Sequence, residues 1–115
     1  MLRRTLRLKT PAVFQKAFRF GRAFFFGVVG CRVVFCTGGG RKFGFVAAKK
    51  MFKTAVERNH ARRILSEAVY SITASFPENV HIVLFFRSRP ENVPFKVIQK
   101  DIVGLANLVK TAYFK

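Results

Sequence analysis

Basic side chains of the kinds that bind phosphate are concentrated between residues 49 and 67. Arginine stays charged and can donate two parallel hydrogen bonds to one phosphate. The cationic residues of this stretch are Lys49, Lys50, Lys53, Arg58, Arg62 and Arg63, and Asn59 and His60 lie among them. Only Glu57 and Glu67 accompany them, so the cluster repels itself unless a polyanion supplies the countercharge. A basic helix face is more often merely solvated, but the shortage of acids here favours a nucleic-acid contact.

The charge of the whole chain points in the same direction. Its 115 residues include 22 Lys and Arg against 5 Asp and Glu, which gives a formal net charge of +17. Such an excess is informative about binding partners rather than about the fold. Nucleic acid is the leading candidate partner and an anionic membrane surface is the second. No run of residues reaches the roughly 18 apolar positions that a membrane span needs.

Groups that could catalyse a reaction are scarce. Hydrolysis of a phosphodiester by a protein usually needs clustered carboxylates that hold metal ions. The acids of this chain are widely spaced in the sequence, and His60 and His81 show no ligand spacing. There is also no nucleophile motif and no phosphate-binding glycine loop. We therefore expect no catalytic residue, no metal site and no cofactor bound by the chain alone.

The cysteines and the amino terminus indicate the compartment. Cys31 and Cys36 are five positions apart in a strand-like run, so a regular strand places them on opposite faces. A disulfide between them is therefore not expected, and two thiols are too few for a zinc site. Buried, reduced thiols are typical of a cytoplasmic protein. Residues 1–9 lack acids and could mimic a transit peptide, but a basic arm on an RNA-binding domain explains them better.

The basic cluster needs a helix to position it. Thr54 is a candidate N-cap, and Glu57 follows at the spacing of a capping box. An apolar stripe at helical spacing should face the core, and it consists of Ala61, Ile64, Leu65, Ala68 and Ile72. On the opposite side lie Asn59, Arg62, Arg63 and Ser66, with Arg58 on the flank. The helix should end by Phe76 because Pro77 cannot continue it.

The remaining segments alternate between helix and strand patterns. We expect strands at residues 24–36, 43–48 and 80–86, and helices at residues 11–21 and 95–113. Gly27 and Gly30 should bend the first strand, and residues 37–42 form a loop that suits a hairpin turn. The apolar side of the last helix should be Val97, Ile98, Ile102, Leu105, Leu108 and Val109. This order predicts one α+β domain over residues 1–115, a two-layer sandwich with helices packed on one sheet.

The basic cluster also carries a family resemblance. Lys49-Lys50, then Ala55-x-Glu57-Arg58-Asn59-x-x-Arg62-Arg63 and Glu67, resemble the signature of the protein component of bacterial ribonuclease P. The flanking stretches Phe14-Gln15-Lys16-Ala17-Phe18 and Phe43-Gly44-Phe45-Val46 resemble the same family. His60 is a departure, because the family usually has a second arginine there and an unperturbed histidine is mostly uncharged at neutral pH.

The resemblance implies a particular fold. It is the αβββαβα arrangement with a mixed sheet, of the type found in the second domain of ribosomal protein S5. It includes an unusual left-handed crossover around the signature helix. The residues alone indicate only three strands, so the fourth rests on the resemblance. For parallel strands the general rule favours a right-handed crossover instead.

The resemblance also implies roles. A catalytic RNA subunit would cleave precursor tRNA, with Mg2+ expected for the holoenzyme, and the protein would help to bind the substrate. The signature helix would face the catalytic RNA. This gives an RNA-binding role to Lys49, Lys50, Lys53, Arg58, Asn59, His60, Arg62 and Arg63. The 5′ leader would lie in a cleft between the first helix and the sheet, which gives Phe14 and Phe18 a leader-binding role. From their spacing alone, core packing of an amphipathic helix is the favoured explanation for both phenylalanines.

Two other functions fit the same charge. A ribosomal protein or RNA chaperone with a basic α+β fold would also be strongly basic, although it would not need the Ala-x-Glu-Arg-Asn arrangement. A peripheral membrane protein would need exposed aromatic residues on a basic amphipathic helix. Most phenylalanines here fall in strand-like segments instead.

Overall fold

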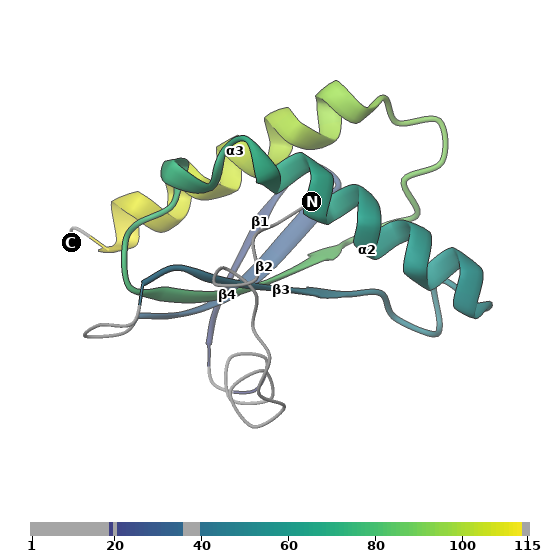
Figure 1. Cartoon of the computed structure of the whole chain (residues 1–115), viewed down its shortest axis with the longest axis horizontal. Coiled ribbons are helices and arrows are strands. Elements are labelled where there is room, and N and C mark those ends of the chain that lie inside the picture. The colour runs from purple at the N-terminus through teal and green to yellow at the C-terminus, as the bar shows by residue number, and fades with distance from the viewer. Residues whose placement is uncertain (1–18, 20, 36–39, 114–115) are drawn as a thin grey trace.

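A computed structural model describes residue 19, residues 21–35 and residues 40–113. The predicted first helix, with Phe14 and Phe18, falls largely outside these residues, as does Cys36. The helices α2 and α3 cover one face of a single sheet (Figure 1), which confirms the two-layer α+β sandwich. The elements in chain order are β1 (Arg22–Phe26), β2 (Val29–Phe35), β3 (Lys42–Val46), α2 (Ala55–Tyr70), a short 3-10 turn (Thr73–Ser75), β4 (Val80–Phe86) and α3 (Phe95–Tyr113).

The sheet has four strands in the order β1-β2-β4-β3, so the last strand in the sequence lies inside it. The β1–β2 and β2–β4 pairs are antiparallel, and β3 and β4 are parallel. Two strand predictions are therefore wrong. The single strand predicted over residues 24–36 is replaced by β1 and β2, because Gly27 adopts a φ of 59° and the chain reverses there. The loop at residues 37–42 is not a hairpin turn, because β4 separates β2 from β3. The sequence of β4 is almost continuously apolar, and such a strand is most stable inside a sheet. This explains its position between β2 and β3.

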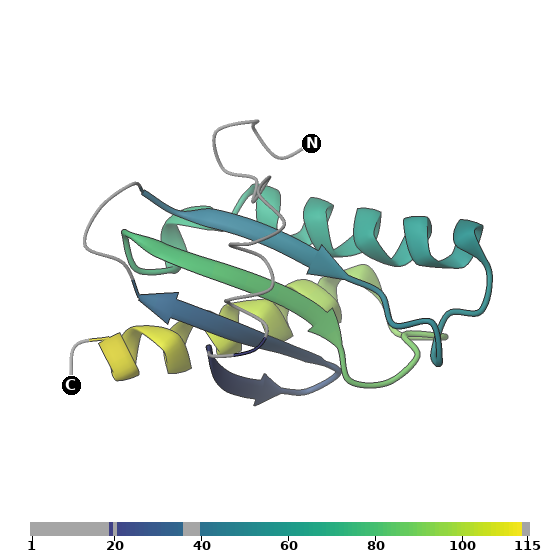
Figure 2. The ribbon, with the colours of Figure 1, turned by 90° about the horizontal axis from the view of Figure 1, so that it is seen from below.

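The connection from β3 through α2 to β4 is left-handed. Figure 2 shows the sheet in front of the helices, with β3 above β4, both pointing the same way, and α2 behind them. If the view is rotated so that β3 and β4 both point upwards, β4 lies to the right of β3. The chain therefore passes from left to right through α2, which lies behind the sheet. That is the uncommon hand for a parallel crossover, and it is the one that the family resemblance implies.

The core lies between the sheet and the two helices. The buried residues of α2 are Ala61, Leu65, Ala68 and Val69, and those of α3 are Ile98, Ile102, Leu105, Ala106 and Val109. The predicted stripes were thus largely right. The exceptions are Val97 and Leu108, which are 42% and 41% exposed because they lie at the edges of the stripe on α3. Ile64 and Ile72 are only partly buried, although both pack against the core.

The turn between β1 and β2 is fixed by α3. The Val28 N–H donates to a carboxylate oxygen of Asp101 at 3.2 Å, and the Val28 carbonyl accepts from the Arg87 N–H at 2.8 Å. A Cβ on Gly27 would lie 2.1 Å from that same carboxylate oxygen. Gly27 is therefore required both by its backbone angle and by the close approach of Asp101.

Candidate nucleic-acid interface

The first turn of α2 forms as the sequence predicts. Thr54 is the N-cap, and its hydroxyl oxygen accepts from the Glu57 N–H at 3.1 Å. The same hydroxyl lies 3.2 Å from a carboxylate oxygen of Glu57, to which it donates. A cap of this kind contributes about 1 kcal/mol to helix stability. It fixes where the helix starts, and so which residues of the basic cluster share a face.

The turn before α2 carries the three lysines of the cluster. The Met51 and Phe52 N–H groups both donate to the Ala48 carbonyl, at 3.1 and 2.9 Å. Phe52 is 5% exposed and anchors this turn in the core. Lys49, Lys50 and Lys53 are exposed around it. The turn thus presents these lysines beside the positive, amino-terminal end of the helix dipole.

The polar residues of α2 divide into two groups. Arg58 is half-buried, and its guanidinium donates to the Phe52 and Lys53 carbonyls at 3.0 and 3.3 Å, so it stabilises the preceding turn. Arg62 is half-buried as well and donates to the Asn59 side chain. Asn59, His60 and Arg63 are exposed. The predicted RNA-binding residues all lie on α2 or on the turn before it, and together we call them the basic surface: Lys49, Lys50, Lys53, Arg58, Asn59, His60, Arg62 and Arg63.

Arg89 is a residue of this region that the sequence did not reveal. It follows β4, and its guanidinium donates to the Met51 carbonyl and to Glu57 and Glu91, both at 2.9 Å. The same group lies 5.7 Å from the centroid of the Phe52 ring. No local motif marks Arg89, because its partners lie up to 38 residues away in the sequence.

Arg89 changes the electrostatics of the basic surface. Its hydrogen bond is the largest cause that lowers the pKa of Glu57, and the Thr54 side chain and backbone act in the same direction. The bonds to Glu57 and Glu91 in turn raise the pKa of Arg89. Glu57 is thus ionised but already paired. Of the two acids in the cluster, only the exposed Glu67 is left to offset its positive charge.

Other titratable groups show no grouping typical of a metal site. Among the described residues, no three His, Cys, Asp or Glu side chains come together in a way that could hold a metal ion. Asp101 is occupied by the β1–β2 turn, and Glu57 and Glu91 by Arg89. These carboxylates therefore have structural partners.

Cys31 is buried in β2, and burial raises the pKa of its thiol from 9.0 to about 12. We expect the folded chain to resist alkylation at Cys31 at about pH 8, because the thiolate is the reactive form. Its contribution to stability should be complete below the unfolded pKa and should be lost as pH rises towards the folded value. Peptide mapping after alkylation, together with unfolding of Cys31→Ala at several pH values, checks both statements. Rapid native alkylation would contradict them.

The sheet face opposite α2 and α3, the outer face, carries aromatic and cationic groups. Phe25, Gly30, Phe85 and Val46 lie side by side across the four strands. The Phe25 and Phe85 rings meet edge to face at 6.2 Å, and a Cβ on Gly30 would lie under 3 Å from both. The Arg87 guanidinium lies 4.9 Å from the centre of the Phe25 ring, which is 48% exposed as a residue. This arrangement offers a stacking surface to an unpaired base.

Comparison with known proteins decides the family. Residues 2–110 match the sequence model of the family described as Ribonuclease P. The chain belongs to the ribonuclease P protein family. It is 34% identical over 106 residues to the "Ribonuclease P protein component" of Chloroflexus aggregans, a match that covers 90% of this chain and 77% of that protein. The chain is therefore a ribonuclease P subunit, and the ribosomal-protein alternative is not supported.

Solved structures show the same fold in this family. The ribonuclease P protein from Thermotoga maritima has a TM-score of 0.78 at 20% identity, covering 90% of this chain and 96% of that one. The ribonuclease P protein of Staphylococcus aureus has a TM-score of 0.71, also at 20% identity, covering 91% and 95%. At this identity the likeness concerns the fold. Within the described residues, no helix is long and apolar enough to cross a membrane.

Proposed function

We propose that this chain is the RNA-binding subunit of a ribonuclease P whose RNA subunit cleaves precursor tRNA. The basic surface on α2 binds the catalytic RNA, and the outer face of the sheet binds the 5′ leader of the substrate. The observation that carries this proposal is a cationic helix face whose nearest acid, Glu57, is already paired with Arg89. Such a face gains most from the phosphates of an RNA.

The basic surface suits a folded RNA for geometric reasons. Its lysines lie on the turn before α2, and arginine side chains hold that turn in place. Arg89 donates to the Met51 carbonyl, and Arg58 donates to the Phe52 and Lys53 carbonyls. A fixed turn lowers the entropy lost when its lysines meet phosphates. Phosphate contacts of this kind fix the position of the protein on the RNA.

The outer face suits a single strand. An exposed aromatic ring with a guanidinium above it stacks on a base of any identity. Phe25 and Arg87 supply that pair, and the resemblance adds Phe14 and Phe18 from the first helix. A leader has unpaired bases to stack, whereas mature tRNA has lost them.

Reconstitution tests this proposal. Nuclease-treated chain with Mg2+ should leave precursor tRNA intact, and addition of the RNA that copurifies with the protein should restore cleavage at the 5′ end of the mature sequence. Turnover by the RNA-free chain at the holoenzyme rate would contradict it. So would a copurifying RNA that supports no cleavage.

Single substitutions of Phe14, Phe18 and Phe25 by alanine should weaken holoenzyme binding of precursor tRNA and leave mature tRNA affinity nearly unchanged. The expected loss is about 1 kcal/mol or more for each stacked base, roughly fivefold in affinity. Tyr70→Ala is the matched control, because Tyr70 is 53% exposed on α2 and lies away from the outer face. If a phenylalanine instead packs in the core, its loss should cost roughly 3–5 kcal/mol of stability and affect both ligands equally.

A further inference from the structure

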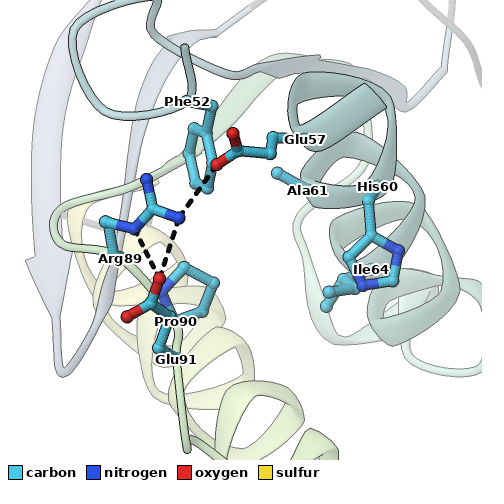
Figure 3. A pocket seen from close by; sticks show the side chains of 8 residues that line it. All are labelled: Phe52, Glu57, His60, Ala61, Ile64, Arg89, Pro90 and Glu91. Carbon is cyan, nitrogen blue, oxygen red and sulfur yellow. Dashed lines mark hydrogen bonds and ion pairs between the residues drawn. The ribbon is translucent and has the colours of Figure 1, made fainter. Parts of the chain in front are cut away.

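A pocket of about 200 Å³ lies beside the basic surface, between α2 and the loop that follows β4. Figure 3 shows His60 and Ile64 of α2 on one side, and Arg89, Pro90 and Glu91 of the loop on the other. Phe52, Glu57 and Ala61 complete the lining. The pocket lies between these two sides, and of its lining residues only His60 belongs to the basic surface.

The lining does not suit a phosphate. Glu57 and Glu91 both point to Arg89 beside this pocket. Their two negative charges exceed the single positive charge of Arg89, so the group of three carries a net charge of about −1. A carboxylate repels the phosphate backbone but accepts hydrogen bonds from the N–H groups of a base edge. Phe52, Ala61, Ile64 and Pro90 supply apolar contacts for a ring. The lining thus matches a nucleobase better than it matches the backbone of the RNA.

His60 gives this pocket its exposed wall. It also lines the neighbouring hollow formed by Val56, Asn59 and Arg63, so it stands between the pocket and the basic residues. An imidazole is a planar ring on which a base can stack. His60 thus offers a base a stacking partner without the permanent charge and forked donors that suit an arginine to phosphate.

We propose that this pocket binds one unpaired base of the RNA held by α2, with His60 stacking on it. Guanine fits best, because its Watson–Crick edge presents neighbouring N–H donors to a carboxylate. Glu91 has an oxygen for this purpose that is not the one bonded to Arg89. The inference rests on the proposed function in needing an RNA partner, and it goes further in naming a base-specific contact.

Substitutions of His60 separate stacking from phosphate binding. The full-length chain is titrated with its copurifying RNA at several salt concentrations. His60→Phe should keep affinity within about twofold, whereas His60→Ala should lose about tenfold, as expected for one stacked base. The log–log salt slope should be the same for all three proteins, because a stacking contact releases no counterion.

The opposite pattern would overturn the proposal. If His60 contacts phosphate, His60→Phe should be as weak as His60→Ala, and His60→Arg should bind more tightly with a slope steeper by roughly 0.7–0.9. Absence of RNA binding by the native chain would instead contradict the proposed function itself. The two failures are therefore distinguishable.

Chemical probing tests the choice of base. A dicarbonyl reagent that modifies the Watson–Crick edge of unpaired guanine should find one guanine protected by the native chain and exposed again with His60→Ala. Glu91→Gln removes the charge of a residue whose side chain is 67% exposed, so the fold should be retained. It should expose the same guanine. If no guanine regains reactivity in either variant, the inference is wrong.

Discussion

Replacement of Lys49, Lys50 and Arg63 by alanine should make RNA binding much less sensitive to salt. Each phosphate contact contributes about 0.7–0.9 to the log–log slope, so the loss of three contacts should make the slope shallower by about two to three units. These residues are chosen because they are exposed on the basic surface. Arg58 and Arg62 are avoided because they also bind groups of the chain itself. Titration of the RNA partner at several salt concentrations measures the effect.

A second triple variant controls for the change in net charge. Lys96, Lys100 and Lys110 lie on α3, away from the basic surface, and their replacement removes the same three charges. The slope of this control should stay close to that of the native chain. Equal slopes for both triple variants would show that the protein binds RNA by its overall charge rather than through α2.

Gly27→Ala should destabilise the fold by about 2–4 kcal/mol. Part of this cost comes from a side chain in the left-handed backbone region, and the rest from losing the contact between the Val28 N–H and Asp101. Gly40→Ala is the matched control, since Gly40 has a φ of 75° but no atom within 4 Å of the place that a Cβ would occupy. It should lose only about 1–2 kcal/mol. Urea unfolding compares the two variants.

A double substitution identifies the cause. If a Cβ at position 27 clashes with the Asp101 carboxylate, Asp101→Ala should lower the free energy of unfolding less in the Gly27→Ala variant than in the native chain. If Gly27→Ala and Gly40→Ala instead lose the same free energy of unfolding, the backbone angle alone explains the loss. The close approach of Asp101 on α3 would then contribute nothing to the stability of the fold.

The helices could be predicted well because their signals are local. The cap at Thr54 and the spacing of Leu65 and Ala68 define the start and the buried face of α2, and α3 begins and ends where its apolar pattern does. The end of α2 was less well predicted, because the helix stops at Tyr70 and a short 3-10 turn precedes Pro77. The basic surface followed from the same pattern, since a helix start determines which side chains share a face. The spacing could not show that Arg58 binds backbone carbonyls, because the preceding turn determines that contact.

The sheet and the loop contacts were harder to predict because they depend on distant residues. The short turn at Gly27 is hidden in a run of apolar residues that resembles one long strand. The position of β4 between β2 and β3 depends on which strands pair, and pairing leaves little mark on either strand alone. Arg89 is the clearest case, since its bonds to Met51 and Glu57 form only after β4 has brought the two loops together. The family resemblance supplied the fourth strand that the residues did not.

The position of β4 has a consequence for the order of folding. This strand pairs with β2 on one side and β3 on the other, yet it is made after both of them and after α2. On the ribosome, β3 cannot join the β1–β2 pair until β4 emerges, and pairings across such long separations are intrinsically slow. Until then the apolar stripe of α2 has no complete sheet to cover it, which is the kind of exposure that promotes aggregation. The helix that carries the basic surface is therefore synthesised early but is covered by a complete sheet only late. We expect the nascent chain to depend on protection of α2 during that interval.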